Sequence, residues 1–114
     1  MAGFSPFQPQ SKCSVVDNSA AVQVQAPSTA GSIQYRIRNR SSSEAYLAWA
    51  APQGGGGATQ PTMPSVAPIV GTPQTGVIGM LGSSVETFTL PPNCYFQAIT
   101  AGGATFEIIA GEGV

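Results

Sequence analysis

The sequence contains no histidine, and its few carboxylates are scattered. Histidine is the most common general base, the most common zinc ligand and the base of the usual serine and cysteine triads. Two acids brought together by the fold could still act as a glycosidase-like pair, but no two of them form a pairing motif. We therefore expect no enzymatic activity, no catalytic residues, no metal site and no cofactor. The acids are Asp17, Glu44, Glu86, Glu107 and Glu112.

Charge is also scarce, since charged residues make up 8% of the 114-residue chain whereas ordinary soluble domains contain about 25%. The net charge is −1, so little electrostatic repulsion keeps copies of the chain apart, and such surfaces favour association. A net acidic chain without a basic patch that interleaves aromatics is a poor nucleic-acid binder. We expect a protein that works inside an assembly, forms a homo-oligomer and binds no nucleic acid.

Long apolar runs are missing as well. No run approaches the roughly 20 residues of a membrane helix, and no basic stretch leads into an apolar segment of the secretory type. We therefore expect no membrane contact and no export. Cys13 and Cys94 lack the spacing of metal or redox motifs and are predicted to be buried free thiols. A chain of this length is predicted to form one domain, residues 1–114.

What the sequence does contain is an alternation of apolar and polar residues with a period of two, the pattern of half-buried β-strands. In residues 32–39 it predicts that Ile33, Tyr35 and Ile37 face the core. The whole pattern predicts an all-β fold, a single antiparallel β-sandwich with jelly-roll-like topology and about eight short strands. The other candidate strands are residues 13–17, 20–26, 44–50, 76–81, 84–90, 94–100 and 104–110, and segments 39–44 and 100–105 are predicted to be hairpin turns.

The first segment that departs from the strand pattern is the start of the chain. Residues 1–11 contain two prolines close to Phe4 and Phe7 and no acid. Proline keeps such a segment extended and out of a central strand, so we predict an extended N-terminal arm. It is either an attachment whose phenylalanines fill pockets on a neighbouring subunit or a frayed terminus.

The second departure is a Gly/Pro-rich loop, residues 51–75. A connection this long is uncommon in a compact domain and is usually functional or flexible. The glycine run at 54–57 is no phosphate loop, because the Lys-Ser/Thr pair that should follow is missing. The segment is either a mobile surface loop or a proline-stiffened arm that buries apolar side chains against partners. Those side chains are Met63, Val66, Ile69 and Val70.

Three of the four basic residues, Arg36, Arg38 and Arg40, occupy every second position of one predicted strand. On one strand face they stand about 7 Å apart, where they can contact carboxylates, phosphates or backbone carbonyls. This face is either solvated or docked against an acidic or polar partner surface. We favour docking, because protein interfaces enrich arginine and deplete lysine.

Three stretches resemble small virion structural proteins of tailed bacteriophages. "IQYRIRNRSSSEAYLAWAA" is similar to a strand of the V-R-V-x-N type followed by a turn and an apolar strand. "MLGSSVETFTLPPN" is similar to a methionine-led segment that runs into a strand and a Pro/Gly turn. "QAITAGGATFEIIAGEGV" is similar to the ending A-A-I-T-x-x-G-x-A-T-x-x-V-x-x-G-E-G. The resemblance covers residues 31–50 and 80–114, and its motifs are framework patterns rather than chemical ones.

The resemblance implies a β-sandwich that assembles in many copies without catalysis. Small β domains of phage heads commonly act as decoration (cement) proteins over the junctions between major capsid subunits. We therefore predict a capsid decoration protein of the virion, made in the host bacterial cytoplasm, with the major capsid protein or other virion subunits as partners. The alternatives are a neck or tail component and a sandwich module that binds host-surface glycans. The predicted partner-contact residues are Phe4, Phe7, Arg36, Arg38, Arg40, Met63, Val66 and Ile69.

Overall fold

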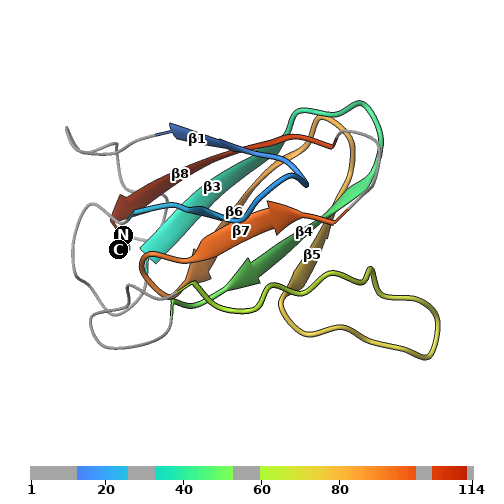
Figure 1. Ribbon diagram of the computed structural model, residues 1–114. Helices are drawn as coiled ribbons and strands as arrows, with labels where there is room; N and C mark the ends of the chain where they lie inside the picture. Colours follow the sequence, from blue (N-terminus) through green and yellow to red (C-terminus); the bar gives the residue numbers. More distant parts are fainter. Residues whose placement is uncertain (1–12, 26–32, 53–59, 100–103, 113–114) are drawn as a thin grey trace.

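The computed structural model describes residues 13–25, 33–52, 60–99 and 104–112 of the chain, whose arrangement is shown in Figure 1. Within these ranges there are eight strands and no helix, which confirms the predicted all-β fold. Every predicted strand is present, although the candidate at 20–26 contributes only a two-residue strand. The strands are β1 (Cys13–Val16), β2 (Val22–Gln23), β3 (Ile33–Asn39), β4 (Ala45–Ala50), β5 (Val77–Met80), β6 (Val85–Leu90), β7 (Tyr95–Ala98) and β8 (Phe106–Glu112).

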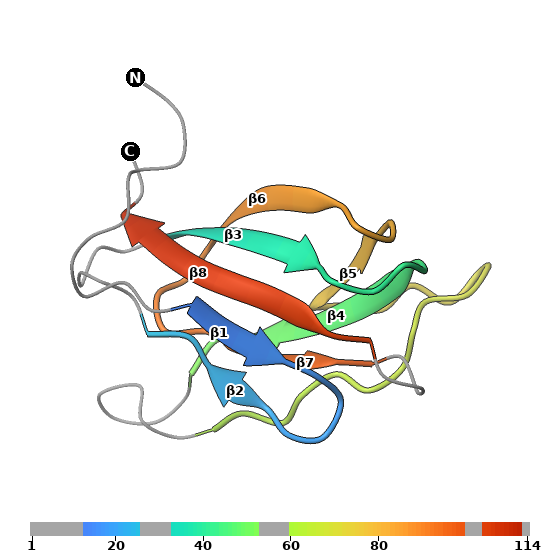
Figure 2. The same ribbon diagram turned by 90° about the horizontal axis from the view of Figure 1, so that it is seen from above.

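The strands form two four-stranded antiparallel sheets that face each other as layers (Figure 2). Sheet A has the order β1-β8-β3-β6, and sheet B has the order β2-β7-β4-β5. In sheet A, Tyr35 of β3 lies opposite Phe88 of β6 on one side and Ala110 of β8 on the other. In sheet B, Trp49 of β4 lies opposite Phe96 of β7. This two-layer arrangement is compatible with the predicted β-sandwich.

Consecutive strands lie in opposite sheets, except for β4 and β5, which pair with each other. The predicted hairpins at 39–44 and 100–105 are therefore wrong, because β3 and β4, like β7 and β8, belong to different sheets. Turn residues indicate that the chain reverses direction, but the same residue types serve a hairpin within one sheet and an arch between two sheets. Residues 100–103 themselves lie outside the described residues.

The core lies between the two sheets. Ile33, Tyr35 and Ile37 are fully buried, which confirms the facing predicted from the alternation. Tyr35 meets Phe96 of the opposite sheet edge to face, with ring centroids 5.2 Å apart, an arrangement favoured by the aromatic quadrupole. Burial of apolar surface is the main stabilising contribution to such a fold. The other large apolar side chains of the core are Phe106, Leu47, Met80, Ile108, Val16 and Val24.

The end of β3 is fixed by one buried polar side chain, Asn39. Its Nδ2 donates hydrogen bonds to the backbone oxygens of Ser43 and Leu81, both at 3.1 Å. The same nitrogen lies 3.4 Å from the backbone oxygen of Met80, and Oδ1 accepts the backbone N–H of Ser41 at 2.9 Å. Both ends of the amide are satisfied, as a buried polar group requires. The side chain thereby ties the arch from β3 to β4 to the turn between β5 and β6.

A second buried network joins Tyr35 to Cys94. The Tyr35 hydroxyl donates to the backbone oxygen of Pro91 at 2.7 Å and accepts the backbone N–H of Cys94 at 3.2 Å. The Cys94 thiol also donates to the Pro91 oxygen, at 3.1 Å. Burial raises the pKa of the Cys94 thiol to about 11 and raises the pKa of Tyr35 as well. Cys94 is thus a buried free thiol as predicted, whereas Cys13 is free but exposed, because it lies on the outward side of an edge strand.

Residues 60–76, called the finger below, belong to the connection from β4 to β5. They extend away from the two sheets in Figure 1. At the base of the finger, the backbone N–H of Trp49 donates a hydrogen bond to the backbone oxygen of Gly76 at 2.8 Å. Gly76 has a φ of +76°, and a Cβ there would lie 2.8 Å from the Trp49 oxygen, so this position requires glycine. At the tip, Ile69 and Thr72 form an antiparallel bridge with two backbone hydrogen bonds of 3.3 and 2.9 Å. The glycine run at 54–57 lies outside the described residues.

Candidate functional site

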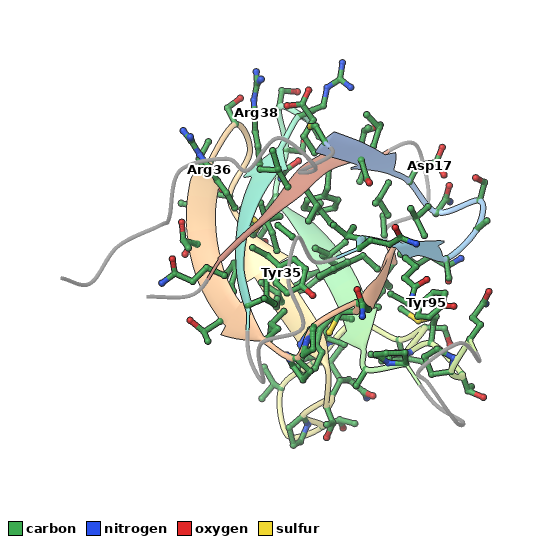
Figure 3. All side chains as sticks on the ribbon, turned by 90° about the vertical axis from the view of Figure 1, so that its left-hand side faces the viewer. Asp17, Tyr35, Arg36, Arg38 and Tyr95 are labelled. Atoms are coloured by element: carbon green, nitrogen blue, oxygen red, sulfur yellow. The ribbon has the colours of Figure 1, made fainter. Side chains whose placement is uncertain are left out.

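The outer face of sheet A presents two rows of side chains that cross all four strands. Because side chains alternate along a strand, residues paired across the sheet share a face. Figure 3 shows Arg36 and Arg38 pointing away from the molecule and Tyr35 pointing between the sheets. One row consists of Cys13, Ile109, Arg36 and Thr87, and the next consists of Val15, Glu107, Arg38 and Val85.

The charges on this face are unbalanced. Glu107 forms ion pairs with two arginines. The distance is 3.6 Å between its Oε1 and Nη1 of Arg38, and 3.4 Å between its Oε2 and Nε of Arg40. Arg36 makes no ion pair with any of the residues that the structure describes. Two guanidinium groups therefore share one carboxylate, and the third has none among the described residues. Partly exposed pairs of this kind contribute about 0–1 kcal/mol to stability, so they do not explain why the arginines are there.

Between the two rows the face has a hollow of about 280 Å³. Its floor and walls combine aliphatic side chains, a thiol and charged groups. Ligand pockets for small molecules typically measure about 300–1,000 Å³, so this hollow lies at the lower limit of that range and is large enough for one or two side chains. The lining residues are Cys13, Arg36, Arg38, Val85, Glu107 and Ile109.

The finger carries the other surface of interest. Val70 at its tip is 103% exposed, and Ile69 and Val66 are 70% and 56% exposed. Met63 is half-buried near the base. No charged residue occurs anywhere from residue 45 to residue 85. The tip is thus an uncharged aliphatic surface held on an ordered turn.

The edge of sheet A formed by β6 is a poor docking site. Strand β6 pairs only with β3 among the described residues, which leaves its other edge open. Glu86 of β6 lies opposite the buried Ile37 and so stands on the side of the strand that faces the other sheet. Charged residues in this position discourage edge-to-edge pairing of strands. Strand addition at the β6 edge is therefore disfavoured.

Several predicted contact residues come together, and others do not. Arg36 and Arg38 lie side by side in the hollow, and Arg40 stands just beyond β3 beside Glu107. Val66 and Ile69 share the finger with Met63, far in the sequence from the arginines. Phe4 and Phe7 lie outside the described residues. Four residues that line the hollow were not among the predicted contacts, although the alternation in 84–90 and 104–110 places three of them outward. The four are Cys13, Val85, Glu107 and Ile109.

Three other kinds of site were predicted to be absent or were left as alternatives, and the described residues bear on each of them. Among the described residues, no three His, Cys, Asp or Glu side chains lie close enough to hold a metal ion. No helix in these ranges has the length and hydropathy of a membrane span. The aromatic side chains that could stack on a sugar, Trp49, Tyr35, Tyr46 and Tyr95, are all buried or half-buried. What the described surface presents is a cationic hollow and an aliphatic finger.

Comparison with models of known protein families, with curated protein sequences and with solved structures gave no significant match.

Proposed function

We propose that this chain is a structural protein of a tailed-bacteriophage virion, and within that class a capsid decoration (cement) protein that stabilises contacts between major capsid subunits. Three features support the proposal: the framework patterns that resemble phage virion proteins, the charge-poor composition and the two-sheet all-β architecture. In this role the protein acts through its surfaces alone, without catalysis or a cofactor.

We also infer that the two sheets form a jelly roll. The orders β1-β8-β3-β6 and β2-β7-β4-β5 place the first strand beside the last, and all connections except the one from β4 to β5 lead from one sheet to the other. Two Greek keys folded over each other are expected to give eight strands arranged in this manner. Jelly rolls are used by viral capsid proteins, which is consistent with a virion role, although a fold alone does not define a function.

The observation that carries the proposal is the aliphatic tip of the finger. Val70 and Ile69 are exposed on a turn whose backbone is already hydrogen-bonded. Covering apolar surface is favourable by roughly 25 cal/mol per Å², and an ordered tip loses little conformational entropy when it docks. A tip of this kind is suited to an apolar pocket on a neighbouring subunit, as a protein that clamps a shell requires.

Cryo-electron microscopy of virions of the phage that encodes this chain tests the proposal directly. We expect density for many copies on the outside of the head, at junctions between major capsid subunits. Finding the chain in a few copies at the neck or tail, or absent from the particle, would refute the decoration role.

A pair of finger variants tests the contribution of the tip. Ile69→Asp combined with Val70→Asp places charge where we expect an apolar contact, whereas Thr75→Asp places one charge at an exposed site near the finger base. All three substitutions are at exposed positions, so the isolated domain should unfold at nearly the same urea concentration. In sedimentation of protein with particles that lack it, we expect binding to be lost only in the tip variant. Equal binding by both variants means that the tip is not an anchor.

A further inference from the structure

We propose that the hollow on the outer face of sheet A binds an acidic segment of a neighbouring protein subunit. A carboxylate of that segment lies between Arg36 and Arg38, and an adjacent aliphatic side chain covers Val85 and Ile109. The inference names the kind of partner for one surface of the virion protein proposed above and rests on that proposal for the partner's place in the particle.

The position of the carboxylate follows from the register of β3. Arg36 and Arg38 are two residues apart on one strand face, so their Cβ atoms are about 7 Å apart. Guanidinium groups at this separation can converge on one carboxylate, and their planar donors match its two oxygens. Arg38 already shares Glu107 with Arg40, with 3.6 Å between Arg38 and the carboxylate. Arg36 has no such partner among the described residues, so the hollow retains a preference for an added negative charge.

The walls determine the rest of the occupant's chemistry. Val85 lies opposite Arg38, and Ile109 lies opposite Arg36. Val85 is 45% exposed, so aliphatic surface stands open to solvent directly beside the guanidinium groups. A volume of about 280 Å³ holds a carboxylate side chain and one aliphatic neighbour.

A nucleic-acid backbone also carries anions, but it fits the hollow less well. Glu107 stands in the same row as Arg38 and would repel a phosphate chain that follows the strand. The hollow is lined by aliphatic side chains and no aromatic one, whereas single strands bind through stacked aromatics and a continuous basic track. A mixed acidic and aliphatic peptide satisfies both the cations and the walls.

The test uses the isotopically labelled full chain and the capped tripeptide acetyl-Leu-Glu-Leu-amide as the probe. Its Leu-Gln-Leu counterpart is the uncharged control, and a short oligothymidine is the nucleic-acid probe. We expect the Glu peptide to shift the amide signals of Arg36, Val85 and Ile109 in a saturable manner, with an affinity about tenfold above that of the Gln peptide. The oligothymidine should shift none of these signals at the same concentration.

Two matched variants locate the effect. Arg36→Gln removes a charge from the hollow, whereas Arg40→Gln removes the same charge from a position that does not line it. We expect Arg36→Gln to lower the affinity for the Glu peptide about tenfold and Arg40→Gln to lower it much less. Equal affinity for both peptides, equal loss in both variants, or no saturable shift would overturn the inference, and tighter binding of the oligothymidine would assign the hollow to nucleic acid instead. These binding measurements need no virion. The peptide can therefore fail to bind while microscopy still finds the chain on the head, which would overturn only the inference about the hollow. Peptide binding by a chain that is absent from the head would overturn only the decoration role.

Discussion

Among the polar side chains that the structure describes outside the Tyr35 network, Asn39 is the one whose replacement with alanine should destabilise the protein most. The Asn39 amide is fully buried and makes three short hydrogen bonds to backbone groups, with distances of 3.1, 3.1 and 2.9 Å. Each contributes about 1 kcal/mol net, and a buried backbone group left without its partner costs about 1–3 kcal/mol. We expect Asn39→Ala to lower the free energy of unfolding by roughly 3–5 kcal/mol, a large part of the 5–15 kcal/mol that stabilises most domains.

Urea unfolding followed by the fluorescence of Trp49 measures this effect. With a urea dependence of about 2 kcal/mol per M, the midpoint should fall by roughly 2 M. Asn18→Ala is the matched control, because Asn18 is exposed in the turn between β1 and β2 and its loss should change stability by at most about 0.5 kcal/mol. If the two variants unfold at the same urea concentration, the Asn39 amide does not tie the arch to the turn and the reasoning fails.

Three further outcomes are expected. A thiol reagent should modify Cys13 in the native protein and Cys94 only after unfolding, since the first is exposed and the second buried; rapid modification of both would contradict the buried network. The pKa of Cys94 is raised from 9.0 to about 11, so between these values the native state keeps a proton that the unfolded state loses. Stability should therefore fall as the pH rises through this window, by roughly 1 kcal/mol per pH unit, and urea titrations of Cys94→Ala should show a smaller fall. Gly82→Ala should lower the melting temperature by roughly 5 °C or more, because the added Cβ would overlap the backbone carbonyl of Ser42; an unchanged melting temperature would show that the two turns are not in close contact.

The alternation of residue types was sufficient to predict where the strands lie and which face of β3 is buried. In β3 it placed Ile33, Tyr35 and Ile37 in the core and Arg36 and Arg38 outside, as the structure has them. It could not assign strands to sheets, because facing is a local property whereas pairing joins residues far apart in the chain. The arch after Asn39 shows the difference. Its serines indicate a reversal of the chain, but Asn39 bonds to the backbone of residues 80 and 81, far along the sequence, and β4 lies in the other sheet.

The candidate site was also predictable only in its local features, those that lie within one stretch of the sequence. The line of arginines could be recognised because Arg36 and Arg38 lie within one strand and Arg40 follows directly after it. The aliphatic finger could be recognised because its prolines and apolar residues are contiguous in the sequence. The hollow could not be recognised from the sequence. It forms because the register of β8 against both β1 and β3 brings Cys13 and Ile109 beside Arg36. The expectation that Cys13 is buried was wrong for a related reason, since burial depends on which side of an edge strand the residue occupies.

The pairing of the first strand with the last has a mechanical consequence. Cys13, the first residue of β1, lies opposite Ile109 in the middle of β8, while Val16 lies opposite Phe106 at the start of β8, so the ladder between the two strands ends at the pair Cys13 and Ile109. The incoming and outgoing chain therefore meet at the same end of one antiparallel ladder. A force that pulls the two ends apart loads its hydrogen bonds one after another rather than all together, so the domain should open by unzipping of β1 from β8 at low force.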